Sequence, residues 1–184
     1  MYQLAAAGVM GYGYGIMAER GVDLVLQSQY TGHAAGTPFA AVNGGVLVRN
    51  YYPGLALFNW TTGGLQPRSI VTQVLSAHLD VGSDTVLSGP AAATNEATDV
   101  YALALESAGG DNSAALSRRK VILVNKRSTP RQVDIAKALH GAASTAYVVD
   151  QTYTDQPSPR VEAVASGEAI TLPAFATAVV VQTV

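Results

Sequence analysis

The sequence contains no cysteine and little charge, and each shortage excludes a class of function. Without cysteine there is no disulfide, no thiolate metal site and no cysteine nucleophile. A cytosolic protein and a secreted protein with an adequate core both fit, so the localisation stays open. Charged residues make up 13% of the 184 residues, and the formal net charge is −2. This balance argues against a nucleic-acid partner, which calls for a strongly basic face.

A long apolar run that would suit a membrane span is also missing. The apolar stretch from Leu4 to Ala18 has no basic residue before it, is interrupted by glycines and is shorter than the roughly 20 residues that cross a bilayer. We therefore expect a buried helix there, ended by Gly21 as a left-handed cap, with a signal peptide as the weaker alternative. No membrane partner is expected.

The strings that mark common catalytic and cofactor sites do not occur. There is no GxSxG elbow, no P-loop and no HExxH, and the histidines His33, His78 and His140 are scattered. The string GYGYG at Gly11 to Gly15 lacks a preceding strand and the third glycine of a dinucleotide loop, so close helix packing is the better interpretation. We expect no cofactor and no metal site.

Residues 1–82 are predicted to form a partial α/β segment of helix, strand, long loop and helix. The helices are expected at Gln3 to Arg20 and from Pro67 to Leu79, where apolar residues recur at helical spacing. Val22 to Leu26 reads as a short strand. Between residues 31 and 64 the chain is rich in glycine, alanine, asparagine and tyrosine, which indicates either a lid-like excursion or short hairpin strands.

Residues 83–184 are predicted to form a second unit, an antiparallel β-sandwich. Short apolar runs separated by turn-rich breaks have the rhythm of that fold. The candidate strands are Thr85 to Leu87, Val100 to Leu105, Val121 to Val124, Gln132 to Ala136, Ala146 to Val149, Val161 to Val164, Ala169 to Leu172 and Ala176 to Val181. The stretch RKVILVNKR at Arg119 to Arg127 reads as the central strand, buried on both faces, with Thr177 to Val181 as a neighbour.

The candidate binding residues are polar or aromatic and lie in the first unit. Gln27, Ser28, Gln29 and Tyr30 follow the predicted strand, and the carboxyl end of such a strand is where α/β proteins place ligands. Trp60 could stack on a sugar ring. An ordinary polar loop and a buried aromatic side chain are the alternatives.

Six basic residues fall within fourteen positions around the central strand: Arg118, Arg119, Lys120, Lys126, Arg127 and Arg131. They would form either a patch for an anionic polysaccharide or carboxylated sugar, or charges that flank an aggregation-prone apolar strand. The second interpretation is favoured, because nothing in the sequence shows that these side chains meet on one face.

Several segments together resemble a known family. They are Ala5 to Gly8, Ala18 to Gln27, NWTTG at Asn59 to Gly63, the helix after Pro67 and LPAF at Leu172 to Phe175. In this order they are similar to the C-terminal part of TIM-barrel retaining glycoside hydrolases, with heparanase and related β-glucuronidases nearest and β-xylosidase-like enzymes more distant. The resemblance implies the seventh helix, eighth strand and eighth helix of the barrel, followed by a β-sandwich.

The resemblance also implies which functional parts are missing. In that family both catalytic glutamates lie upstream of the helix that matches Ala5 to Gly21, so no catalytic residue is assigned to this chain. Only Gln27 to Tyr30 would border the substrate cleft. The implied partners are a glycoside or polysaccharide and the remaining part of a barrel, and the parent enzyme could be secreted.

The subfamily and the substrate stay open. Pro67 is followed by Arg68, Ser69 and Ile70, where the family more usually has Asn, Arg, Tyr and Trp. The expected function is therefore the C-terminal part of a retaining glycoside hydrolase that is inactive alone. The alternative is a non-catalytic β-sandwich that binds carbohydrate or another protein.

Overall fold

The computed structural model describes residues 2–22, 57–58, 63–80, 82–87, 99–107, 117–150 and 158–183. Its helices and strands are α1 (Tyr2–Glu19), α3 (Pro67–His78), β1 (Asp84–Val86), β2 (Val100–Ser107), β3 (Arg118–Asn125), β4 (Arg131–Val133), β5 (Ser144–Val149), β6 (Arg160–Val164), β7 (Ile170–Leu172) and β8 (Thr177–Gln182). Both predicted helices and every strand predicted after residue 82 are confirmed. The strand predicted at Val22 to Leu26 lies outside the described residues except for Val22.

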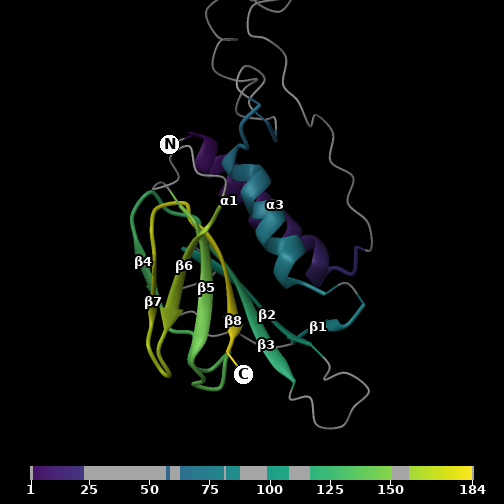
Figure 1. Cartoon of the computed structure of the whole chain (residues 1–184), viewed down its shortest axis with the longest axis vertical. Helices are drawn as coiled ribbons and strands as arrows, with labels where there is room; N and C mark the ends of the chain where they lie inside the picture. Colours follow the sequence, from purple (N-terminus) through teal and green to yellow (C-terminus); the bar gives the residue numbers. More distant parts are fainter. Residues whose placement is uncertain are drawn as a thin grey trace, which may run out of the picture.

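The strands form two antiparallel sheets. The larger has the order β1-β2-β3-β8-β5-β6, and β4 pairs with β7 in the smaller. Figure 1 shows α1 and α3 lying across one face of the large sheet, with β4 and β7 on the other side. The mostly β, sandwich-like architecture expected from the sequence is confirmed, and so is the pairing of β3 with β8, in which Ile122 stands opposite Val179.

The central strand β3 is buried on both faces, as predicted. Val121 and Leu123 belong to a hydrophobic cluster that includes side chains of β4 and β7. Ile122 and Val124, which point the other way, belong to a second cluster that includes side chains of α1 and α3. Because alternate residues of a strand face opposite sides, the sheet needs a cover on each side. The domain boundary expected near residue 82 stays a prediction. The helices α1 and α3 share a hydrophobic core with the large sheet.

Helix α3 covers the sheet with an ordinary apolar face. Pro67 stands in the first turn, where its missing N–H costs nothing. Ile70, Val71, Val74 and Leu75 are buried at helical spacing. Burial of each such side chain contributes roughly 1.5–3 kcal/mol, so this face alone holds α3 on the sheet.

Helix α1 covers the sheet with a smooth face of glycines. A Cβ added to Gly15 would overlap the ring of Tyr101, and one added to Gly11 would lie 2.9 Å from Cγ2 of Thr177. A Cβ added to Gly8 would lie 3.1 Å from the backbone oxygen of Phe175. The string GYGYG therefore lies inside a helix, and its interpretation as close packing is confirmed.

The end of α1 is also as predicted. Gly21 has a φ of 67°, a conformation that glycine adopts without strain. Its N–H donates to the carbonyl of Ala18 at 3.1 Å, and the N–H of Val22 donates to the carbonyl of Met17 at 2.9 Å. This pair of bonds is the Schellman motif, which satisfies the last carbonyls of the helix.

The strand predicted at Gln132 to Ala136 is shorter than expected, because β4 ends at Val133. The Oδ1 atom of Asp134 accepts a hydrogen bond from the N–H of Ala136 at 2.9 Å. Such a local side-chain bond competes with the sheet ladder and turns the chain. Ile135 still enters the core, but from the turn rather than from a strand.

The contrast between glycines of α1 gives a test of its packing. We expect Gly15→Ala to lower the free energy of unfolding by about 1–2 kcal/mol, because overpacking against Tyr101 costs roughly 1–3 kcal/mol and outweighs the gain in helix propensity. Gly13→Ala is the matched control. The nearest atom to a Cβ there is Cε of Met17 at 3.8 Å, so this variant should be stabilised by about 0.5–1 kcal/mol. Urea denaturation measures both, and stabilisation by both substitutions would show that α1 does not lie on Tyr101.

Candidate functional site

The residues predicted from sequence to bind a ligand, Gln27, Ser28, Gln29, Tyr30 and Trp60, lie outside the described residues. Their grouping around a cleft therefore stays a prediction. Within the described ranges no helix meets the length and hydropathy of a membrane span. The same ranges hold no group of three or more side chains that could bind a metal ion.

Three of the described glutamates form an ion pair or a hydrogen bond within the fold. Glu106 pairs with Arg119, Glu162 pairs with Arg160, and Glu168 accepts the N–H of Ala165. Glu19 lies exposed in the last turn of α1. Tyr101 lies beneath this helix, and its phenol pKa is raised by burial and then by the negative charge of Glu19.

The basic cluster around β3 is divided between the two ends of that strand. Arg118, Arg119 and Lys120 belong to its first three positions, whereas Lys126, Arg127 and Arg131 follow its last residue. At 3.3 Å per residue the two groups are about 20 Å apart. The six side chains therefore do not form one patch, and each end has to be considered separately.

At the first end Lys120 is a buried cation held by two aspartates. Its side chain is only 3% exposed, and Nζ lies 2.9 Å from Oδ2 of Asp80 and 3.0 Å from Oδ1 of Asp84. The hydroxyl of Ser107 donates to Asp84 at 2.5 Å. A buried ammonium needs such partners, since removing one leaves an uncompensated charge. Lys120 thus ties the segment after α3 and strand β1 to the centre of the sheet.

The charge of Lys120 also acts on its surroundings. Burial opposes ionisation of Asp84, but hydrogen bonds from Ser107, the Asp80 N–H and Lys120 outweigh it and lower the pKa of this carboxyl. The pKa of His78 is lowered by burial and by Lys120. His78 stacks on Tyr147 with 3.8 Å between ring centroids, so its ring has a packing role at the end of α3.

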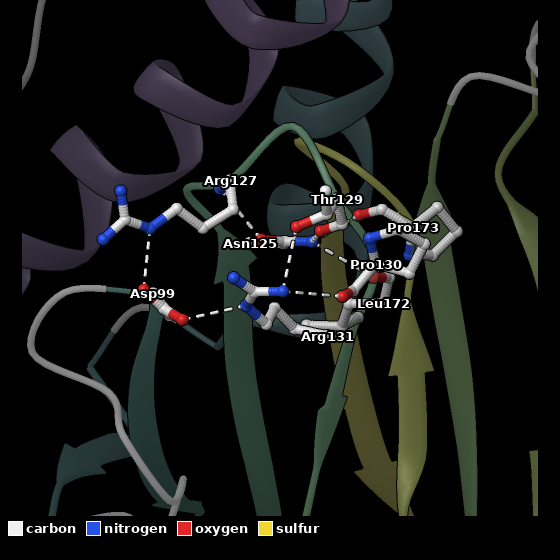
Figure 2. A network of polar contacts seen from close by, with 8 residues as sticks. All are labelled: Asp99, Asn125, Arg127, Thr129, Pro130, Arg131, Leu172 and Pro173. Carbon is white, nitrogen blue, oxygen red and sulfur yellow. Dashed lines mark hydrogen bonds and ion pairs between the residues drawn. The ribbon is translucent and has the colours of Figure 1, made fainter.

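At the second end Asn125 joins two turns (Figure 2). This residue is completely buried, and the two hydrogens of its Nδ2 are shared among the carbonyls of Thr129, Leu172 and Pro173, which lie 2.9, 3.1 and 2.8 Å away. Its Oδ1 accepts the N–H of Arg127 at 2.9 Å. The turn after β3 and the LPAF turn before β8 are therefore fixed to each other through one amide.

Asp99 lies between two arginines at the same end (Figure 2). Nε of Arg127 donates to one carboxylate oxygen at 2.7 Å, and Nε of Arg131 donates to the other at 2.8 Å. The hydrogen bond from Arg127, followed by that from Arg131 and by both positive charges, lowers the pKa of Asp99 against a smaller opposing effect of burial. Arg131 is held further by Oγ1 of Thr129 and the carbonyl of Pro130.

Sequence reasoning missed Asn125 and Asp99. A polar residue at the end of an otherwise apolar buried run was the available signal for Asn125. Its acceptors on Leu172 and Pro173 are 47 and 48 positions away in the chain, which no local pattern reveals. Asp99 precedes β2 directly, but only the antiparallel pairing of β2 with β3 brings it beside Arg127.

The role of Asn125 in joining the two turns can be tested by removing the hydrogen bonds that its side chain donates. We expect Asn125→Ala to lower the free energy of unfolding by roughly 1–3 kcal/mol, because buried carbonyls lose their donor. Asn125→Asp should cost more at neutral pH, since a carboxylate cannot donate to those carbonyls. Gln132→Ala, at an exposed site on β4, is the control. Wild-type stability of Asn125→Asp in urea at pH 7 would contradict this role.

The lowered pKa of Asp84 predicts how the stability of the fold depends on pH. Its pKa is lower in the folded chain than the unfolded value of about 3.9. The stabilisation is therefore complete above that value and is lost as the pH falls through the folded pKa. We expect Asp84→Asn to be less stable at pH 7 and to lose less stability on acidification. Gln132→Ala, at an exposed site on β4, removes no titrating group and should keep the wild-type slope; an equal flattening in both variants would contradict the assignment.

Comparison with known proteins gives one family model and several solved structures. Residues 97–180, less than half of the chain, match the model of the C-terminal immunoglobulin-like domain of D-apionate lactonase. A GH30 endoxylanase from Clostridium papyrosolvens is similar with a TM-score of 0.50 and 17% identity, over 97% of this chain and 46% of the enzyme. A glycoside hydrolase family 30 subfamily 8 xylanase from Clostridium acetobutylicum has a TM-score of 0.47 and 15% identity, over 71% and 31%. No curated protein matches the chain.

At these identities the structural likeness shows the fold alone. The chain spans less than half of the length of either xylanase. Its fold is shared with part of a glycoside hydrolase, and its strands β2 to β8 fall almost wholly within the match to the immunoglobulin-like domain. The finer resemblance to heparanase and β-glucuronidases stays a prediction.

Proposed function

We propose that this chain serves as the C-terminal, non-catalytic part of a carbohydrate-active enzyme of the glycoside hydrolase type. One observation carries the proposal: α1 and α3 share a hydrophobic core with the large sheet, so the helices and the sandwich are built as one body. The likeness to the endoxylanase supports it, because it extends over 97% of the chain and so includes both helices and the sandwich. In this arrangement the helices belong to the barrel, and the sandwich packs beneath them.

The chemistry of glycoside hydrolysis supports a non-catalytic role. It requires two carboxylates on opposite sides of the scissile bond. Of the four glutamates that the structure describes, Glu106 and Glu162 are paired with arginines, Glu168 caps a turn, and Glu19 lies exposed at the end of α1. The catalytic pair would accordingly come from another part of the barrel. Gln27 to Tyr30 and Trp60 would contribute one wall of the substrate cleft.

A second candidate is the corresponding part of a sugar-acid lactonase. The match of residues 97–180 to the C-terminal domain of D-apionate lactonase favours it specifically. The substrate would then be a cyclic ester, and the bond broken would be an acyl bond instead of an acetal. The sandwich would have the same supporting role in both enzymes.

The purified chain should be tested for turnover of xylan, aryl β-xylosides, aryl β-glucuronides and a sugar-acid lactone. We expect none above the buffer rate, because no catalytic carboxylate pair is assigned to these residues. The chain has one tryptophan, so its fluorescence reports directly on binding of a neutral xylo-oligosaccharide near Trp60.

The outcomes separate the alternatives. Turnover that survives Glu19→Gln but is lost when another glutamate of this chain is replaced would overturn the non-catalytic role. A barrel fragment from a related enzyme that regains glycosidase activity with this chain would support the first candidate, and regained lactonase activity alone would support the second. Sugar binding with no regained activity would instead favour a free-standing binding module.

A further inference from the structure

We infer that the end of β3 beside α1 binds the carboxylate of an acidic sugar through Arg127 and Arg131. The inference rests on the proposed function, in which the ligand is a carbohydrate, and specifies that this carbohydrate is negatively charged. It concerns a surface of the sandwich that is formed by described residues. The binding would depend on the charge balance at this end, the orientation of the two guanidinium groups and the aromatic ring next to them.

Among the described residues the charge balance at this end is positive. Asp99 is the carboxylate that pairs with both Arg127 and Arg131. Among the described residues one negative charge therefore serves two guanidinium groups. At the other end of β3 the described charges are even, because Arg118, Arg119 and Lys120 are matched by three carboxylates, those of Glu106, Asp80 and Asp84. An anion would accordingly be attracted to the Arg127 end of the strand.

The guanidinium of Arg127 is exposed and oriented. Its side chain is 48% exposed and uses Nε to bind Asp99, and Figure 2 shows its two terminal nitrogens directed away from that carboxylate. The backbone N–H of Arg127 is fixed to Asn125, which anchors the base of the side chain. A planar fork held in this way suits two parallel hydrogen bonds to a carboxylate.

Arg131 is held even more firmly. Beyond its bond to Asp99, its Nη1 donates to Oγ1 of Thr129 at 2.8 Å and to the carbonyl of Pro130 at 3.2 Å. A side chain that is already ordered loses less conformational entropy when a ligand binds. The side chain remains 34% exposed, so its positive charge acts on a ligand bound at Arg127.

The aromatic ring of Tyr12, which lies next to Lys126, would favour a sugar acid over an inorganic anion. Nζ of Lys126 lies 5.4 Å from the centroid of the Tyr12 ring, and the N–H of Lys126 donates to the carbonyl of Asp99 at 2.8 Å. Tyr12 is 37% exposed and stands edge-on to Tyr101. The apolar face of a sugar ring can pack on such a phenol while its carboxylate reaches Arg127.

The test is calorimetric titration of the whole chain with trigalacturonate, with its fully methyl-esterified form and with sulfate. We expect trigalacturonate to bind and Arg127→Ala to weaken it by about tenfold, the loss for one charge-assisted pair. Arg127→Lys keeps the charge without the fork and should recover only part of this. Arg118→Ala, which removes the same charge from the opposite end of β3, is the matched control and should leave the affinity unchanged.

Equal losses in Arg127→Ala and Arg118→Ala would overturn the inference, because they would show attraction to net charge only. Binding of sulfate as tight as that of trigalacturonate, or undiminished binding of the methyl ester, would overturn it as well. Thermal melting of each variant shows whether it is folded. Absence of binding to a folded chain that also lacks turnover removes this inference and leaves the proposed function intact, whereas turnover by the chain removes the proposed function.

Discussion

The structure depends on the burial of one strand on both faces. β3 contributes Val121 and Leu123 to the core under β4 and β7, and Ile122 and Val124 to the core under the helices. An exposed face of this kind would present a continuous apolar surface to water, which soluble proteins avoid. The two helices are therefore part of the sandwich's hydrophobic core. The glycines of α1 follow from the same constraint, because they let the helix lie close to Tyr101 and Thr177.

The polar residues at the ends of β3 connect this double core to the rest of the chain. Lys120 fastens the segment after α3 through Asp80 and Asp84, and Asn125 fastens the turn after β3 to the turn before β8. Both are buried, and both have partners that come from distant parts of the sequence. The charges therefore do more than flank an apolar strand: Lys120 is neutralised inside the fold at one end, and Arg127 and Arg131 hold Asp99 at the other.

Most of the fold could be predicted because its elements carry local signals. Runs such as VILV in β3 and the spacing of Ile70 and Val74 in α3 indicate their own structures. The early end of β4 could not be predicted, because it depends on a bond from Asp134 that competes with the sheet. The separation of the basic residues into two groups could not be predicted either, because it depends on the length and direction of β3. Gln27 to Tyr30 were predicted to bind a ligand because they follow a predicted strand, and Trp60 because its aromatic ring suits a sugar. No described contact tests either prediction.

Both comparisons include the sandwich: one is the likeness to part of a GH30 endoxylanase, and the other is the match to a lactonase domain. The two named enzymes carry out different reactions. The central claim is that helices and sandwich form one cooperative body around β3. Native-state hydrogen exchange tests it most directly, by comparing the opening free energies at the amides of Gly11 in α1 and Ile122 in β3. We expect equal opening free energies at the two amides, and an equal response of both to urea. A Gly11 amide that opens several kcal/mol more easily, with Ile122 unaffected, would contradict it.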